Sequence, residues 1–149
     1  MRAQTSIDFL VGMSVFLLTV AFVFMALPNS FVPFTGDESA ELLSVDRVAS
    51  HLSDGTLARR GQPGILNETC TTQFFGAPGA CNPSDLNAAL GVGSQQRVNV
   101  TIESNGAIRT VGGVELSAGP SVPTRGSVVV ATRLVAIDGD EHTLYVRMW

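Results

Sequence analysis

The sequence contains no lysine, so all nine of its basic residues are arginine. The formal net charge is −4, and residues 28–149 alone carry the same excess, because Arg2 and Asp8 are the only charges before them. A nucleic-acid-binding protein needs a basic surface, and anionic lipid attracts basic segments. The composition therefore argues against nucleic acid as a partner, and against an anionic lipid surface as a partner of residues 28–149.

Catalytic and metal-binding motifs are also lacking. The two histidines, His51 and His142, have no acidic or thiol partner at ligand spacing, so we expect both to be surface residues. The Gly-Val-Gly segment 91–93 lacks the Gly and Lys that a phosphate loop needs. The acidic residues within 138–141 lack the calcium-loop pattern, and their Asp-Gly pair is explained by a turn. We expect neither an enzyme nor a bound metal or cofactor.

Cysteine is scarce. Cys70 and Cys81 are the only two, and ten residues separate them. This is not the spacing of a CxxC redox or zinc motif, and no second ligand pair accompanies it. In an exported chain the spacing favours one disulfide that closes a surface loop, with two buried free thiols as the alternative.

Apolar residues are concentrated near the N-terminus. Residues 9–27 contain no charge, and as a helix they would span roughly 28 Å, close to the thickness of the hydrocarbon core of a bilayer. No signal-peptidase site follows this run, which ends at Pro28, so we expect the helix to be retained. Arg2 is the only basic residue before it, which predicts a cytoplasmic N-terminus and an external C-terminal region.

The segment that precedes this run, residues 2–8, reads Arg-Ala-Gln-Thr-Ser-Ile-Asp. It resembles the class III signal peptide of type IV pilins, archaellins and pseudopilins, in the archaeal form QxSxE. Prepilin peptidase cleaves that family before the Gln, which here places the cut between Ala3 and Gln4. Two positions depart from the family pattern: Asp8 replaces the usual Glu and keeps its charge, and Gly12 stands where many archaeal members have Leu.

The resemblance implies a pilin-like structural subunit of a surface filament that serves adhesion or attachment. It divides the chain into a leader of residues 1–3, a transmembrane or filament-core helix with a linker (residues 4–34), and an extracellular α+β region (residues 35–149). The expected partners are prepilin peptidase, membrane lipid before assembly, and other subunits through the N-terminal helix, with Asp8 serving assembly. The C-terminal part adds a resemblance to pilin-like proteins of salt-loving archaea.

Two other interpretations remain open. The protein could be a single-span anchored binding or sensor domain that never polymerises. Thr5, Ser6 and Asp8 could simply cap a transmembrane helix, since hydroxyl and carboxylate groups suit the N-terminal end of a helix.

After the apolar run, residues 28–36 predict an irregular stretch. A second helix is expected over residues 37–53, because Leu42, Val45, Val48, Ala49 and Leu52 share one face. Thr35 and Glu38 could form a capping box at its start, and Gly55 is a natural stop. A short helical turn is expected at residues 84–90.

The C-terminal third predicts strands. Residues 97–103 alternate apolar and polar side chains, and Asn-Gly at 105–106 turns this strand into residues 107–111. Residues 127–137 are β-rich on both faces and are expected to form a central strand, which Asp-Gly turns into residues 142–149. The predicted fold class is α+β, pilin-like, with an antiparallel sheet of about four strands and the second helix across one face.

The expected outer surface carries two N-glycosylation sequons, at Asn67 and Asn99. A third candidate, Asn82, is blocked by Pro83. Asn99 falls on the polar face of its predicted strand, which favours its accessibility.

Overall fold

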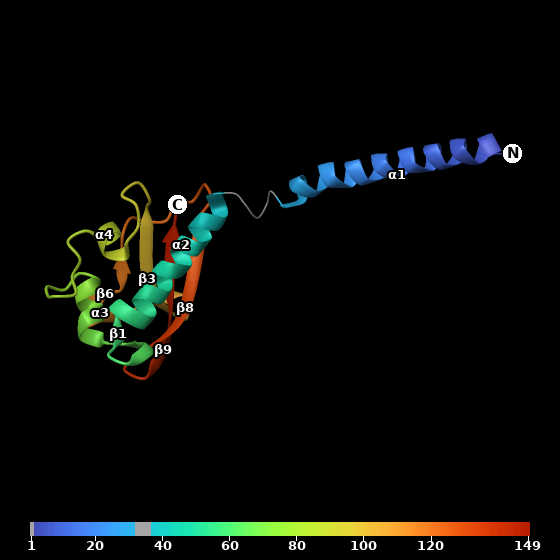
Figure 1. The fold of residues 1–149 in the computed structure, drawn as a ribbon. Helices are drawn as coiled ribbons and strands as arrows, with labels where there is room; N and C mark the ends of the chain where they lie inside the picture. Colours follow the sequence, from blue (N-terminus) through green and yellow to red (C-terminus); the bar gives the residue numbers. More distant parts are fainter. Residues whose placement is uncertain (1, 32–36) are drawn as a thin grey trace. The chain divides into compact units, whose positions relative to one another are not determined.

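The computed structural model describes residues 2–31 and 37–149 of the chain, with side chains for residues 6–25 and 40–149. The chain divides into two compact units, residues 1–39 and residues 40–149. We call the second unit the head, and the two units are described separately (Figure 1).

The first unit contains helix α1 (Arg2–Phe31), which is 30 residues long. At 1.5 Å per residue the helix is roughly 45 Å long. The predicted irregular stretch is wrong for residues 28–31, because α1 continues through Pro28. The proline removes one N–H donor and crowds the carbonyl of the preceding turn, yet the helix continues for three more residues. The rest of that stretch, with the Thr35 of the proposed capping box, lies outside the described residues.

Helix α2 (Asp37–His51) covers one face of the sheet, as predicted (Figure 1). Val45, Val48, Ala49 and Leu52 are at most 3% exposed, because their spacing of three and four residues places them on one helical face. Gly55 does not end the helical path. The chain widens instead into a π-helical turn, η2 (Leu52–Thr56), closed by Leu57 N–H donating to the Leu52 carbonyl at 3.1 Å.

Three long strands form the centre of a seven-stranded, mostly antiparallel sheet. Strand β9 (Asp140–Met148) pairs along its length with β8 (Val129–Ile137) on one side and with β3 (Val98–Ser104) on the other. Both predicted hairpin turns form, with positive φ at Asn105 and Asp138, each followed by glycine. The α+β class and the mostly antiparallel sheet are therefore confirmed.

Short strands complete this sheet. Strand β4 (Ala107–Ile108) lies within the predicted strand 107–111, whereas β1 (Ala58–Arg59), β2 (Gln62–Leu66) and β7 (Ser117–Ala118) were not predicted. A separate hairpin joins β5 (Thr110–Val111) to β6 (Val114–Glu115). Strand β2 runs parallel to β8 and meets it at one register position, Ile65 opposite Ala136.

Strand β8 lies in the interior of the sheet, between β2 and β9, as predicted, although only a short part of its edge toward β2 is paired. Strand β9 lies in the middle of the three long strands, and the face of β8 turned away from α2 exposes Val130 (46%) and Leu134 (68%). The core lies between α2 and the inner face of the sheet. Its fully buried large side chains include Leu52, Leu57, Leu66, Ile102, Leu116 and Leu144.

Two short helices complete the head. Helix α3 (Glu68–Phe74) contributes the buried Phe74, whose ring meets that of Phe75 edge to face. Helix α4 (Leu86–Leu90) is the predicted helical turn. It ends at Gly91, whose φ of 66° is the left-handed conformation that glycine adopts without strain.

Candidate functional site

Helix α1 is the most distinctive chemical feature of the chain. Its segment Ser6–Met25 has a mean hydropathy of 2.3, and none of it is buried within the protein. By length and composition it could cross a membrane, as a membrane anchor or a signal sequence does. Large apolar side chains point outward around the whole helix. They include Phe9, Leu10, Phe16, Leu18, Phe22 and Met25.

Two hydroxyl groups in the middle of this helix are satisfied internally. Ser14 donates to the Leu10 carbonyl at 2.7 Å, and Thr19 donates to the Val15 carbonyl at 2.8 Å. A polar group that already has a partner costs less to transfer into an apolar environment. The described part of α1 is therefore suited to lipid or to a bundle of similar helices.

The predicted processing residues, Ala3 and Gln4, lie within the first turns of α1, and their side chains are outside the described ones. Asp8 is exposed and immediately precedes the uncharged run. The helix begins at Arg2, so Thr5, Ser6 and Asp8 do not occupy its capping position. The simple capping interpretation therefore does not hold for the intact chain.

The predicted disulfide between Cys70 and Cys81 is present, with Cα atoms 5.3 Å apart. It joins α3 to the loop that follows. Two side chains support this loop. Asn67 caps α3 by accepting from Cys70 N–H at 2.9 Å, and Gln73 Oε1 accepts from Cys81 N–H at 3.1 Å.

The two sequons lie in very different surroundings. Asn67 is exposed, and its cap uses Oδ1, so it leaves the Nδ2 atom to which a glycan would be attached. Asn99 is only 5% exposed, and its Nδ2 donates to the Pro120 carbonyl at 3.1 Å. The prediction that Asn99 lies on an accessible face is wrong, because its side chain is buried and its Nδ2 donates to the carbonyls of Ala118 and Pro120.

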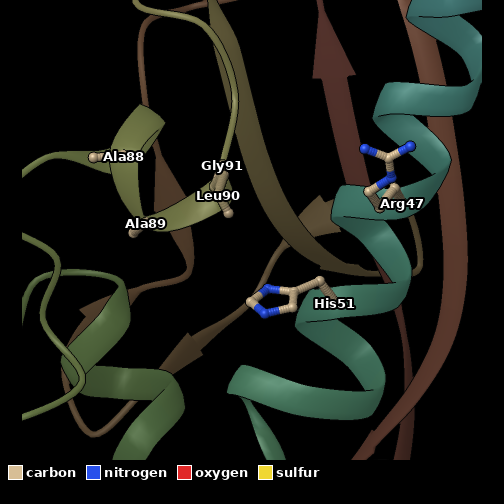
Figure 2. Close-up of a pocket in the computed structure, with 6 residues that line it drawn as sticks. All are labelled: Arg47, His51, Ala88, Ala89, Leu90 and Gly91. Carbon is tan, nitrogen blue, oxygen red and sulfur yellow. The ribbon is translucent and has the colours of Figure 1, made fainter.

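A cavity of about 270 Å³ lies between α2 and α4 (Figure 2). Arg47 and His51, one turn apart on α2, face the segment Ala88-Ala89-Leu90-Gly91. His51 is exposed, as predicted, and its Nδ1 lies 3.2 Å from the Thr56 hydroxyl. The residues that line this cavity include neither a carboxylate nor a thiol, so it carries no acid–base or nucleophilic pair.

His142 is buried, contrary to the prediction that it lies on the surface. It is 5% exposed, because the alternation of β9 places it on the same inward face as Leu144 and Val146. Its Nδ1 is buried without a hydrogen-bond partner. Burial lowers the pKa of His142, the Arg109 charge lowers it further, and Asp140 acts in the opposite direction.

His142 also lines a cavity of about 280 Å³ with Arg109, Asp138 and Asp140. This arrangement does not make a metal centre. Within the part of the chain that the structure describes, no group of three or more His, Cys, Asp or Glu residues is arranged to hold an ion.

A charged network on the outer face of the sheet gave no signal in the sequence. Arg147 donates to Glu103 at 2.9 Å and to the Thr101 hydroxyl at 2.7 Å, and its guanidinium stacks over Tyr145. Burial opposes ionisation of Glu103, but the hydrogen bonds from Arg147 and Thr101 prevail and lower its pKa. Two neighbouring strands, β3 and β9, bring these residues together, so the network links these two strands across the outer face of the sheet.

These features define a class: one exposed apolar helix, long enough to cross a membrane, joined to a disulfide-bonded α+β head. The chain belongs to DUF7287, a family of unknown function, whose family model matches residues 1–149. No curated protein and no solved structure matches the chain.

Proposed function

We propose that this protein is a pilin-like structural subunit of a type IV pilus-related surface filament. Prepilin peptidase would cleave it between Ala3 and Gln4, and the mature subunit would assemble through its N-terminal helix. Before assembly it would be a single-pass membrane protein with the head outside the cell. In the filament it would serve adhesion or surface attachment.

The observation that supports this proposal best is that no residue of the apolar segment Ser6–Met25 of α1 is buried. Burying a Phe, Leu or Val side chain contributes roughly 1.5–3 kcal/mol, and none of the side chains of Ser6–Met25 is buried within the chain. The helix therefore needs an apolar environment, either lipid or other copies of itself. A filament core of packed helices would supply that environment after the subunit leaves the membrane.

Small residues on α1 are compatible with close packing between helices. Gly12 has open space where a Cβ would be, and Ser14 and Ala21 are seven residues apart, on one face two turns apart. The QxSxD segment in the first turns of α1 supplies the second line of support, through its resemblance to class III signal peptides.

The alternative is a membrane-anchored binding or sensor domain that does not polymerise. The same apolar helix supports it, since a lipid bilayer alone would satisfy α1. The two functions differ in whether copies of α1 meet repeatedly, so the test must detect contacts between helices.

Disulfide trapping tests this difference. In the native protein both cysteines are paired with each other, so Ser14→Cys together with Ala21→Cys would place the only free thiols on α1. A filament subunit is expected to give a ladder of crosslinked multimers from the sheared surface fraction. A matched control, Ser94→Cys on the exposed surface of the head, tests for random collision. A chain that stays in the membrane as uncrosslinked monomers would favour the anchored domain.

A further inference from the structure

Strand β8 has an edge that is largely unpaired. On one side it pairs with β9 from Val129 to Ile137, but on the other side β2 meets it only at Ala136. Within the residues that the structure describes, no strand pairs with residues 129–133 on that side. An unpaired strand edge offers backbone donors and acceptors to a strand of another molecule.

The side chains along this edge would favour such pairing. Val130 and Leu134 are 46% and 68% exposed on the outer face, with Thr132 between them. A second copy of the same strand would bury these apolar groups while it completed the backbone hydrogen bonds. A head that stays unpaired therefore needs some feature that keeps a second strand from pairing with this edge.

Arg133 lies at the centre of this edge. By register it shares the inner face with the buried Ala131 and Val135, yet its guanidinium is not in the core. One arm, Nη1, donates to the Thr132 carbonyl at 2.9 Å, so this acceptor of β8 already has a donor. An inward-facing charge on a strand edge is a device that natural sheets use against edge-to-edge association.

Helix α2 holds the guanidinium in this position. The second arm, Nη2, donates to Asp46 Oδ1 at 2.6 Å and to the Ser50 hydroxyl at 2.9 Å. Asp46 and Ser50 are one turn apart, so they form a two-point support on one side of α2. An exposed ion pair contributes little to stability, so we infer that the main effect of this one is to hold the Arg133 side chain in place.

We propose that Arg133 closes the free edge of β8 and so prevents two heads from pairing edge to edge through this strand. The inference concerns the head alone and does not depend on the proposed filament. In an antiparallel pair of β8 edges centred on Thr132, the two Thr132 side chains would be opposite each other, with Cβ atoms about 5 Å apart. That distance allows a disulfide between introduced cysteines.

The test uses the full chain in detergent micelles with Thr132→Cys as the only free thiol. Mild oxidation followed by peptide mass spectrometry measures the dimer linked at position 132. Adding Arg133→Met, which keeps most of the side-chain volume, is expected to raise the dimer yield roughly fivefold, the change that loss of one net hydrogen bond produces. Arg60→Met, an equal charge change in the exposed β1–β2 turn, is the matched control and should leave the yield unchanged.

Equal dimer yields from the Arg133→Met and Arg60→Met proteins would overturn the proposal. If the Arg133→Met protein loses its cooperative melting transition, it is not folded, and Arg133→Lys is tested in its place. Lysine keeps the charge but has no fork to reach both the carbonyl and Asp46. A dimer yield from Arg133→Lys above that of the protein with Arg133 intact then supports the proposal, and an equal dimer yield contradicts it.

Discussion

Removing the disulfide by Cys70→Ser together with Cys81→Ser should destabilise the head by a predictable amount. The bridge closes a short loop, with a sequence separation of 11. In the chain-entropy description, opening a loop of this length costs about 2.8 kcal/mol at 25 °C. For a unit the size of the head, an unfolding entropy of about 2.1 cal/mol/K per residue converts this loss to a fall in melting temperature of roughly 12 °C.

The assay is thermal unfolding of the full chain in detergent micelles, followed by the fluorescence of Trp149. This residue is the only tryptophan, and it lies in the head, so α1 does not contribute to the signal. Gln73→Ala is a useful comparison, because it removes the bond to Cys81 N–H but keeps the covalent loop. A fall of under about 3 °C in the double variant would refute the loop-entropy reasoning, since the unfolded chain would then gain little freedom.

Three further outcomes are expected. The head should lose stability as the pH falls below about 6.5, because the folded-state pKa of His142 lies below its ordinary value and the unfolded chain takes up the proton first. Denaturant titrations at pH 7.5 and 5.5 measure this loss, and His142→Leu should reduce the difference in unfolding free energy between the two pH values. An unchanged difference would exclude His142 as its source. Glycopeptide mass spectrometry of a glycosylated preparation should find glycan at Asn67 and none at Asn99, whereas an occupied Asn99 would contradict its burial in the folded head. Asp8→Ala should leave export and cleavage intact but reduce incorporation into filaments, with Asp8→Glu tolerated; normal assembly of the alanine variant would show that the carboxylate has no role in assembly.

Local patterns in the sequence predicted the elements that depend on local physics. The apolar run indicated α1, the spacing of apolar residues indicated α2, and the alternation of residues 97–103 indicated β3. Asn-Gly and Asp-Gly marked both long hairpins, because few residue pairs adopt the backbone angles of such turns. These signals were sufficient for the fold class.

Strands β1 and β2 could not be predicted in this way. Residues 58–66 are rich in Arg and Gly and include a Pro, and they form β1 and β2 by pairing with each other, while β2 meets β8 at one register position. Pro28 similarly marks the end of the apolar run but not the end of helix α1. For β1 and β2, strand pairing rather than residue preference decides the outcome.

The burial of polar residues was the second feature that could not be predicted from the sequence. Alternation shows which side chains share a face of a strand, but not what covers that face. Asn99 and His142 are both buried for this reason, the first beneath the chain around Pro120 and the second on the inner face of the sheet. Arg133 is the opposite case. Its position in β8 faces inward, where alternation predicts burial, but its guanidinium lies at the edge of the sheet and donates to Asp46 of α2.

The central claim, that this chain is processed and assembled as a pilin-like subunit, is tested most directly at its N-terminus. Intact-mass and N-terminal peptide mass spectrometry of the protein isolated from its own membrane would identify the first residue of the mature chain. The proposed function predicts that this residue is Gln4, with α1 otherwise retained. A mature chain that keeps Met1, or one that begins beyond Pro28, would contradict it.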